Sequence, residues 1–241
     1  MATELSYLDD SEVYESVAQV ARVSREAEGE AVVVTLNKTI FYPQGGGQPT
    51  DKGVISTDGG SLQVERASFV DGDVLHSGVL TSGEIKEGEF AKLVIDASRR
   101  NIHAQLHTGG HLVMTAVDRL LGLPATKGYH FPNGPYVEFM GVVPQERRES
   151  LVQEIQEELD RLVEEDSPVT ARYDTVENLK ASGVYIPAEI PAGKPTRVVV
   201  TSGYQSPCGG THVKSLGELG GLKVKGVKVK SGKTRVSYYF G

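Results

Sequence analysis

The residue pattern changes abruptly near residue 95, and this change constrains the fold more than any other feature of the sequence. Before it, short runs of β-branched and aromatic residues alternate with clusters of Gly, Asp and Ser. After it, residues 98–121 and 144–165 have the length and pattern of helices. A chain of 241 residues is long enough for two domains of ordinary size. We therefore predict a β-rich domain over residues 1–95 and a mixed helix and strand domain over residues 96–241.

The segment before residue 95 is predicted to form a small barrel or curled sheet. Many short strands at regular spacing, separated by turn-forming residues, are typical of such folds. Clusters such as Asp58-Gly59-Gly60 and Thr81-Ser82-Gly83 separate the runs. The predicted strands cover residues 31–36, 39–42, 53–55, 62–64, 67–70, 74–76 and 91–95.

The segment after residue 95 mixes helices with strands. Ser98 is predicted to cap a helix that ends near Gly122, and Pro144 to open a second helix that runs to about Glu165. The second helix has an apolar stripe at Leu151, Ile155, Leu159 and Leu162. Strands are predicted at residues 170–173, 197–200, 222–230 and 235–240, with a short helix at 175–181.

Several classes of protein are excluded by what the sequence lacks. No run approaches the roughly 20 apolar residues that a membrane-spanning helix needs. The first residues are acidic and have no apolar core, which excludes a secretory signal or a transit peptide. Cys208 is the only cysteine, so no disulfide can form within the chain. We therefore predict a protein of the reducing cytosol.

The charge is distributed unevenly along the chain. The net charge is −7, but residues 214–241 hold seven basic residues and one acidic residue, so the other 213 residues carry −13. A polyanion such as nucleic acid would be attracted to this end only. The alternative is a solvated strand pair whose lysines discourage edge-to-edge aggregation.

Three histidines, His103, His107 and His111, are spaced four residues apart on the first predicted helix. Residues four apart lie one turn apart on the same face, so two imidazoles can reach one metal ion. The segment lacks the glutamate that H-E-x-x-H proteases use as a general base. Gly109 and Gly110, between two of the histidines, would either leave bare backbone beside a metal or admit close packing of another element.

Cys208 and His212 lie four residues apart in a second segment that is rich in glycine. A tight turn there would present a thiol and an imidazole together. With His107 and His111 they give four ligands whose number and softness suit tetrahedral Zn²⁺. The alternative for Cys208 is a small buried apolar side chain.

These two segments resemble the zinc motifs of alanyl-tRNA editing domains and, more distantly, those of threonyl-tRNA synthetases. Residues 41–53, Phe-Tyr-Pro-Gln-Gly-Gly-Gly-Gln-Pro-Thr-Asp-Lys-Gly, are similar to the glycine-rich motif of alanyl-tRNA synthetases and AlaX-type proteins. The order of the motifs matches, and no aminoacylation domain is present. The chain is therefore identified as a free-standing AlaX-type editing protein.

The resemblance implies an α+β fold, in which a β-barrel-like N-terminal subdomain packs on a two-layer α/β editing core. It also implies hydrolysis of mischarged tRNA(Ala), chiefly Ser-tRNA(Ala) and secondarily Gly-tRNA(Ala), with zinc as cofactor. The implied partner is the acceptor end of the tRNA, and no membrane is involved. The residues predicted to bind substrate or to act in catalysis are Gln48, Gly46, Gly47, Thr108, Thr126 and His130.

One segment departs from the family pattern. Editing domains of the synthetases tend to carry Gln-Lys-Gly after the zinc helix, and here Thr126 precedes Lys127-Gly128. Tyr129-His130 that follows is bulkier than expected. The departure affects amino-acid preference more than reaction class, and His130 either lines the pocket or is a hydrogen-bonded strand histidine.

The chemistry leaves the role of zinc open. Zinc can lower the pKa of a bound water and so supply the nucleophile, or it can hold the substrate while other groups place the water. A site that hydrogen-bonds the serine hydroxyl rejects alanine, because its polar groups would be left unpaired. The lysines predicted to bind tRNA phosphates are Lys223, Lys225, Lys228 and Lys230, paired at i, i+2 along one strand.

Three rival functions remain on the sequence alone. The first is the same reaction on another tRNA, such as Ser-tRNA(Thr). The second is a non-catalytic tRNA-binding protein with structural zinc. The third is a zinc hydrolase of small metabolites, which would show no salt-dependent binding of tRNA.

Overall fold

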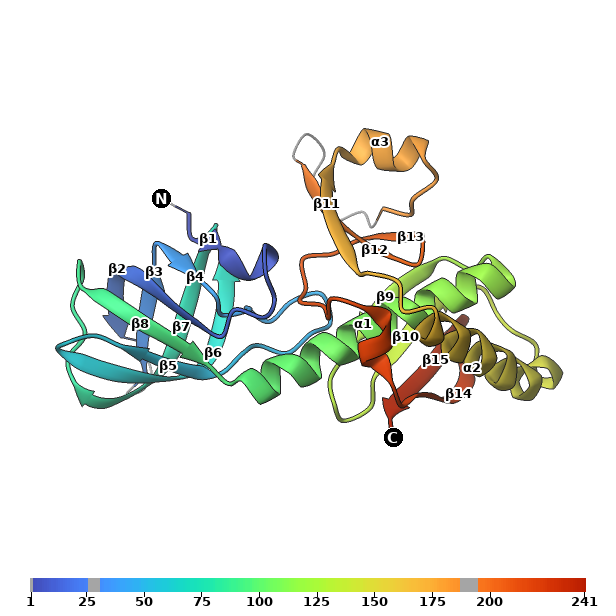
Figure 1. Ribbon diagram of the computed structural model, residues 1–241, viewed down its shortest axis with the longest axis horizontal. Helices are drawn as coiled ribbons and strands as arrows, with labels where there is room; N and C mark the ends of the chain where they lie inside the picture. The colour runs from blue at the N-terminus through green and yellow to red at the C-terminus, as the bar shows by residue number, and fades with distance from the viewer. Residues whose placement is uncertain (1, 26–30, 187–194) are drawn as a thin grey trace. The chain divides into compact units, whose positions relative to one another are not determined.

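The structure of the protein, a computed structural model, describes residues 2–25, 31–186 and 195–241. Its internal contacts divide the chain into an N-terminal unit, Met1–Ile102, and a C-terminal unit, His103–Gly241 (Figure 1). Each unit has its own cluster of buried apolar side chains. The predicted α+β class with a barrel-like part is confirmed, whereas the domain boundary after residue 95 stays a prediction.

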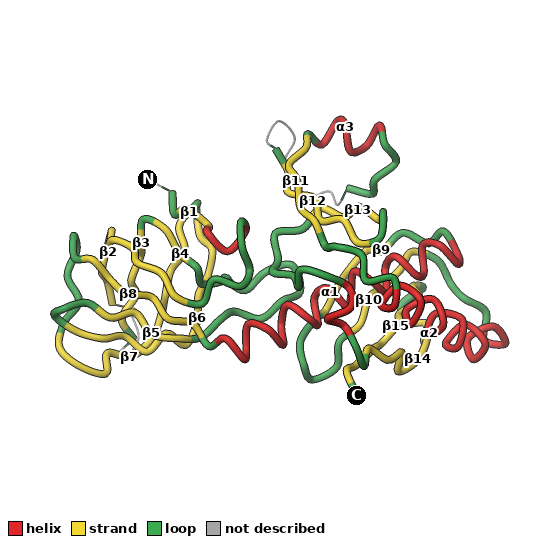
Figure 2. The backbone as a smooth tube through the Cα atoms, viewed as in Figure 1, coloured by secondary structure: helices red, strands yellow, loops and turns green. Residues whose placement is uncertain are grey.

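The N-terminal unit is built around a closed barrel, and Figure 2 shows this part of the chain as mostly strand. The strands are joined in the order β2-β3-β7-β6-β5-β8, and β1 pairs in parallel with β4 outside the barrel. Inward-facing valine, leucine and isoleucine side chains fill its interior, because successive side chains of a strand alternate between faces. The strands are β1 (Glu4–Leu5), β2 (Glu15–Arg25), β3 (Val32–Leu36), β4 (Lys38–Thr39), β5 (Gly53–Ser56), β6 (Gly60–Val70), β7 (Asp73–Gly83) and β8 (Phe90–Ile95).

The strand predicted over residues 39–42 is wrong beyond Thr39. Phe41 and Tyr42 are buried, but their backbone groups bond to side chains and to the backbone of Asp51. The amide of Phe41 donates to the Thr39 hydroxyl at 3.0 Å, and that of Tyr42 donates to the Asp51 carboxylate at 2.7 Å. The apolar run at residues 40–42 therefore indicates burial in the core, but it does not indicate pairing with another strand.

The first helix, α1 (Ala97–Leu121), is capped by Asp96 and not by Ser98 as predicted. A carboxylate oxygen of Asp96 accepts a hydrogen bond at 2.9 Å from the backbone amide of Arg99, three residues later, which is the bond that an N-cap side chain makes. The helix ends where predicted, since Gly122 adopts a φ of 62° that favours glycine.

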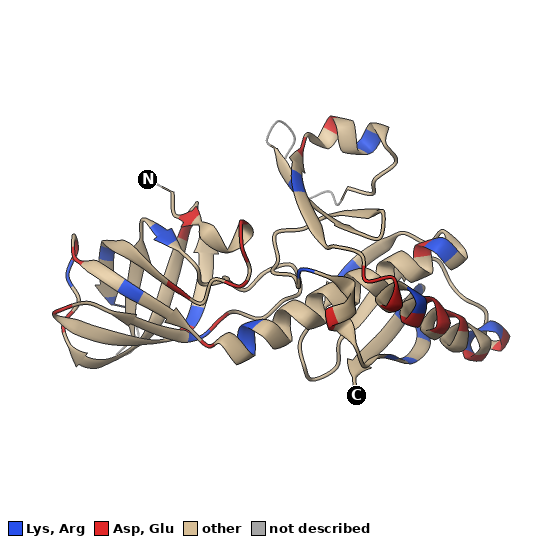
Figure 3. Cartoon of the chain, in the orientation of Figure 1, with Lys and Arg blue, Asp and Glu red and all other residues tan. Residues whose placement is uncertain are grey.

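The C-terminal unit packs α1 and α2 (Arg148–Glu164) with a four-stranded sheet of order β14-β15-β10-β9. A short 3-10 turn at Gln145–Arg147 precedes α2, and the predicted stripe of Leu151, Ile155, Leu159 and Leu162 is buried. Acidic and basic residues line the rest of α2 in Figure 3. The strands are β9 (Ala125–Tyr129), β10 (Tyr136–Met140), β14 (Leu222–Lys230) and β15 (Lys233–Phe240).

A second sheet of the C-terminal unit has the order β11-β12-β13. Its strands are β11 (Thr170–Asp174), β12 (Thr196–Thr201) and β13 (Tyr204–Pro207), and the short helix α3 (Val176–Ala181) follows β11. The hydroxyl of Thr175 caps α3 by accepting the amide of Asn178 at 3.2 Å. Among the described residues, no helix has both the length and the apolar character needed to cross a membrane.

Candidate metal centre

The first half of the candidate site lies on α1, which presents His107 and His111 one turn apart. Their ring centroids are 5.1 Å apart, and both residues are only 2% exposed. Spacing of four residues on a helix places both rings on one face, as the sequence predicts.

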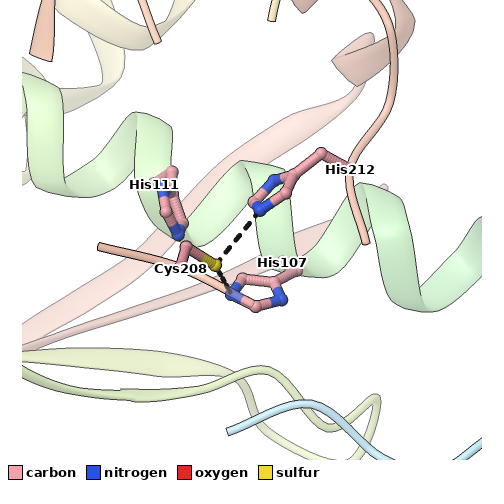
Figure 4. A group of neighbouring side chains, drawn as sticks. All are labelled: His107, His111, Cys208 and His212. Atoms are coloured by element: carbon pink, nitrogen blue, oxygen red, sulfur yellow. Dashed lines mark hydrogen bonds between the residues drawn. The ribbon is translucent and has the colours of Figure 1, made fainter. Parts of the chain in front are cut away.

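The second half is the turn that follows β13, and it brings Cys208 and His212 to the same point (Figure 4). The Sγ atom of Cys208 lies 3.4 Å from Nε2 of His107 and 3.3 Å from Nε2 of His212. One potential ligand atom from each of the four residues lies within 4.8 Å of all the others. The structure therefore brings together all four residues that the sequence predicts as ligands.

The donor set fits a tetrahedral metal ion. Ligand atoms at about 2.0–2.3 Å from a tetrahedral ion lie roughly 3.3–3.8 Å from each other, which matches the two sulfur–nitrogen separations. In addition, Nδ1 of His111 is buried and has no hydrogen-bond partner among the described residues. Three imidazoles and one thiol suit a borderline-soft divalent ion, so these residues can hold a metal.

Thr108 fixes the orientation of His212. Its hydroxyl donates to the Ala104 carbonyl at 2.8 Å, and it therefore accepts from Nδ1 of His212 at 3.1 Å and from the Val213 amide at 3.2 Å. With Nδ1 as the donor, the lone pair of Nε2 points toward Cys208, which is the orientation that a metal ligand needs. The hydroxyl has no remaining donor or acceptor capacity in this conformation.

Burial keeps the imidazoles of the site neutral, which is the form that binds metal. It lowers the pKa of His111 to about 4, and it lowers the pKa of His107 and His212 well below the usual value, with repulsion from the neighbouring rings adding to the effect. Burial raises the pKa of the Cys208 thiol, while the Gly210 amide and Arg197 oppose that rise.

Arg197 on β12 is a residue of the site that the sequence does not reveal. Its Nη1 donates to the carbonyls of Cys208 and Gly210, both at 3.0 Å, and its own carbonyl accepts the Cys208 amide at 3.0 Å. The guanidinium thus holds the turn that carries the thiol. A single arginine in an apolar strand gives no sequence signal, because its partners depend on how β12 pairs with β13.

His130 lies beside the four potential ligands but is not one of them. Its ring stacks on that of His107 with centroids 4.4 Å apart, and its Nδ1 lies 2.7 Å from the Tyr238 hydroxyl. That hydroxyl in turn donates to the Leu106 carbonyl at 2.8 Å. His130 is therefore hydrogen-bonded and lies against the cluster, and its contact with substrate stays a prediction. His103 is also outside the cluster.

The two glycines of α1 admit close packing of other elements. A Cβ on Gly110 would lie 2.3 Å from Cε1 of His130, and a Cβ on Gly109 would lie 3.2 Å from Leu222 and 3.3 Å from Phe240. Only a residue without a side chain leaves room for the His130 ring against α1. This favours packing over exposed backbone as the reason for the Gly-Gly pair.

Thr126 lies half-buried on β9, where its hydroxyl donates to the Glu138 carbonyl at 3.3 Å. Gln48, Gly46 and Gly47 belong to the N-terminal unit. There Gly46 and Gly47 have φ values of 51° and 78°, and they form a turn closed by hydrogen bonds between Gly45 and the fully buried Gln48. Contact between these residues and substrate stays a prediction.

The glycine-rich segment is anchored by an ion pair that the sequence does not predict. Asp51 and Arg100 are both completely buried and bonded to each other, and Arg100 also donates to the Ser11 carbonyl at 2.8 Å and to the Ile40 carbonyl at 2.5 Å. This pair ties the end of the segment to the first turn of α1 within the N-terminal unit.

Comparison with known proteins places both parts of the chain among proteins of tRNA charging. Residues 2–99 match the family described as tRNA synthetases class II (A). Residues 196–237, which include Cys208 and His212, match the threonyl and alanyl tRNA synthetase second additional domain.

Relatives cover nearly the whole chain. The alanyl-tRNA editing protein AlaX-L of Pyrococcus horikoshii is 33% identical over 92% of the chain and 54% of its own length. Alanine–tRNA ligases of Delftia acidovorans and Halobacterium salinarum are 31% and 33% identical over 94% and 99% of the chain, and 28% and 26% of their own length. The chain thus spans about half the length of the editing protein and about a quarter of the ligases.

Proposed function

This chain is a relative of the alanyl-tRNA editing proteins and of the alanine–tRNA ligases, and we propose that it hydrolyses the ester bond of mischarged tRNA(Ala). The main substrate is Ser-tRNA(Ala), with Gly-tRNA(Ala) as a second. The observation that carries the proposal is the convergence of His107, His111, Cys208 and His212, from two segments about a hundred residues apart, in a chain with these relatives.

The metal is Zn²⁺, which the three imidazoles and one thiol suit by number and softness. When bound, it supplies Lewis-acid chemistry, either to a water molecule or to the substrate. Thr108 orients the ring of His212 so that Nε2 can bind the ion. We therefore assign Thr108 to positioning a ligand and not to contact with the substrate. Arg197 holds the backbone of the turn that presents the Cys208 thiol.

The ring of His130, beside the cluster, is fixed in place by the elements that surround it. The ring of His130 is held between α1 and β9, because a Cβ on either Gly110 or Gly128 would lie 2.3 Å from a ring atom of His130. Its bond to Tyr238 and its stacking on His107 further restrict the orientation of the ring. Such fixed groups favour a reaction that depends on placing an ester and a water precisely enough for attack.

Selectivity for serine over alanine rests on the serine hydroxyl. Gln48 and Thr126 are the proposed partners of that hydroxyl or of the attacking water. A site built to bond a hydroxyl rejects the substrate that lacks it, since burying the unpaired amide or hydroxyl costs about 1–3 kcal/mol. This spares Ala-tRNA(Ala), the correct product of charging.

The partner is the acceptor end of the tRNA, and the lysines of β14 are proposed to contact its phosphates. Lys223, Lys225, Lys228 and Lys230 are all exposed. The Nζ atom of Lys223 lies 3.5 Å from a carboxylate oxygen of Asp160, so part of its charge is offset. The cytosol is the proposed location.

A deacylation assay with Ser-, Gly- and Ala-tRNA(Ala) and with Ser-tRNA(Thr) tests the proposal. We expect rapid release of serine from tRNA(Ala), slower release of glycine and almost none of alanine. Chelation and the Cys208→Ala substitution should both abolish release. The Ser-tRNA(Thr) arm is needed because the matching family includes threonyl-tRNA synthetases. Binding of tRNA without hydrolysis of any ester would refute the proposal and favour a non-catalytic RNA-binding protein with structural zinc.

A further inference from the structure

One face of the sheet β14-β15-β10-β9 is turned away from the hydrophobic core. Val137 and Phe139 of β10, and Val236 and Tyr238 of β15, are buried in the core of the C-terminal unit. Because side chains alternate along a strand, the intervening residues point to the opposite face. We call this opposite face the outer sheet face. It carries Tyr129, Tyr136 and Arg235, together with Lys228, Lys230 and Lys233 on the two paired strands β14 and β15.

A row of stacked planar groups crosses the outer sheet face. The ring of Phe131 stacks on Tyr129 with centroids 4.6 Å apart, and Tyr129 stacks on Tyr136 at 5.2 Å. The guanidinium carbon of Arg235 lies 3.7 Å from the centre of the Tyr136 ring, which continues the row by a cation–π contact. The interplanar angles of the two ring pairs are 15° and 18°, so the groups are nearly parallel.

Phe131 ends this row in a partly exposed position. Among the described residues, its ring has no second aromatic or cationic neighbour, and part of the side chain is exposed to solvent. At the other end, Arg235 is fixed by an ion pair with Glu138 at 2.6 Å. The row therefore has an ion-paired arginine at one end and a partly exposed phenylalanine at the other.

Positive charge surrounds the row. The four strands of this sheet contain seven basic residues and a single acidic residue, Glu138, which is already paired with Arg235. The strand register places Lys228 opposite Arg235, Lys230 opposite Lys233, and Lys127 opposite Glu138. The lysines are exposed, so their charges face solvent.

We propose that the outer sheet face binds an unpaired segment of RNA. Nucleobases extend the row by stacking on Phe131, and phosphates lie along Lys228, Lys230 and Lys233. Every base has a planar face, and stacking on an aromatic side chain contributes about 1–3 kcal/mol per base. Paired bases in an A-form helix do not offer those faces, so the row favours single strands over duplexes. That this RNA is the single-stranded end of a tRNA rests on the proposed function; the affinity for single strands does not.

The test uses the full chain with a fluorescein-labelled, unstructured RNA 12-mer and with a duplex of the same length. We expect the single strand to bind more tightly. Phe131→Leu should weaken single-strand binding by about 5–150-fold, the fold-change that corresponds to loss of one stacked base. The matched control is Phe69→Leu, which replaces an exposed aromatic residue of the barrel and should bind as the wild type does.

A second pair of variants tests the phosphate contacts. Replacing Lys228, Lys230 and Lys233 with Gln should lower the slope of log affinity against log salt concentration by roughly 2, since each phosphate contact to a single strand contributes about 0.7. The control replaces Lys86, Lys92 and Lys180 with Gln, which is the same change in charge. It should keep the wild-type slope of log affinity against log salt concentration. Thermal unfolding and metal content of all variants should match the wild type, which shows that they are folded.

Equal affinity of Phe131→Leu and Phe69→Leu, or duplex binding as tight as single-strand binding, would overturn the proposal. Neither result depends on catalysis. If the wild type binds single strands in this way but hydrolyses no mischarged tRNA, the proposed function fails and the outer sheet face stands. If the wild type hydrolyses Ser-tRNA(Ala) but Phe131→Leu binds single-stranded RNA as tightly as the wild type does, the outer sheet face proposal fails and the proposed function stands.

Discussion

The hydroxyl of Thr108 lies 3.1 Å from Nδ1 of His212 and so links α1 to the turn that carries Cys208. Thr108→Val removes this acceptor and so takes one hydrogen-bond partner from Nδ1 of His212 and one from the Val213 amide. Loss of such a supporting hydrogen bond lowers metal affinity by about 10–100-fold. Chelator competition measures the change. Thr108→Ser keeps the hydroxyl and should restore most of the affinity, whereas equal affinity of the Val variant and the wild type would show that His212 is oriented by other contacts.

Gly110 and Gly109 provide a matched pair of substitutions on α1. In Gly110→Ala, the new Cβ would lie 2.3 Å from Cε1 of His130 and 2.9 Å from the Tyr238 hydroxyl. We expect a loss of about 1–3 kcal/mol in the free energy of unfolding, because overpacking displaces fixed groups. In Gly109→Ala, the new contacts are side-chain ends at 3.2–3.4 Å, and the better helix propensity of Ala offsets them. Denaturant unfolding should rank Gly110→Ala clearly below Gly109→Ala, and the opposite order would contradict the packing.

Arg197 is expected to matter for metal binding although it is not a ligand. Arg197→Met removes two hydrogen bonds to the turn, each from a charged donor and therefore worth about 1.5–3 kcal/mol. Metal affinity should fall by at least about tenfold in the Met variant. Arg197→Lys keeps the charge but not the planar fork, so it should recover only part of the affinity. Full affinity in the Met variant would mean that the turn holds its shape without the guanidinium.

Gln48→Ala tests the predicted contribution of the glycine-rich segment to chemistry. If the amide helps bind the serine hydroxyl or the water, single-turnover deacylation should slow by about 10²–10³, as for loss of one positioned donor. Metal content should stay the same, and thermal unfolding corrects for the cavity left by a fully buried side chain. The exposed Gln153→Ala on α2 is the control. Unchanged kinetics would assign the segment a structural role only.

His76 makes the stability of the barrel depend on pH. It is completely buried, with Nδ1 2.9 Å from the Val34 carbonyl and Nε2 2.8 Å from the Thr39 hydroxyl. Burial lowers the pKa of His76 from 6.5 to about 4, and the bond to Val34 opposes this only in part. Between these values the unfolded chain binds the additional proton, so the stability present above pH 6.5 declines as the pH falls toward 4. The decline is worth up to about 3 kcal/mol.

The comparison of wild type with His76→Gln isolates this effect, because the other titrating groups are common to both proteins. Urea unfolding at pH 7.5, 6.0 and 5.0 should show a steeper loss of unfolding free energy in the wild type. Parallel loss in the two proteins would assign the pH dependence to other residues.

The sequence by itself determines which side chains can form the metal site and where most elements lie. Four-residue spacing places His107 and His111 on one face of any helix, and the only thiol lies four residues from His212. The stripe of Leu151, Ile155, Leu159 and Leu162 in the same way specifies both the second helix and its buried face. These are local properties, set by the period of a helix and by the chemistry of each residue.

Only the tertiary structure decides which distant groups surround that site. Arg197 reaches the carbonyl of Cys208 because β12 and β13 pair in one register, and His130 fits beside His107 because Gly110 and Gly128 lack a Cβ. The tertiary structure also decides the conformation of Ile40–Tyr42. These strand-like residues pack in the core, and the Tyr42 amide donates to the Asp51 carboxylate instead of to a neighbouring strand. Sequence periodicity reports burial along a segment, whereas strand register, close approach and hydrogen-bond partners arise from the packing of segments far apart in the chain.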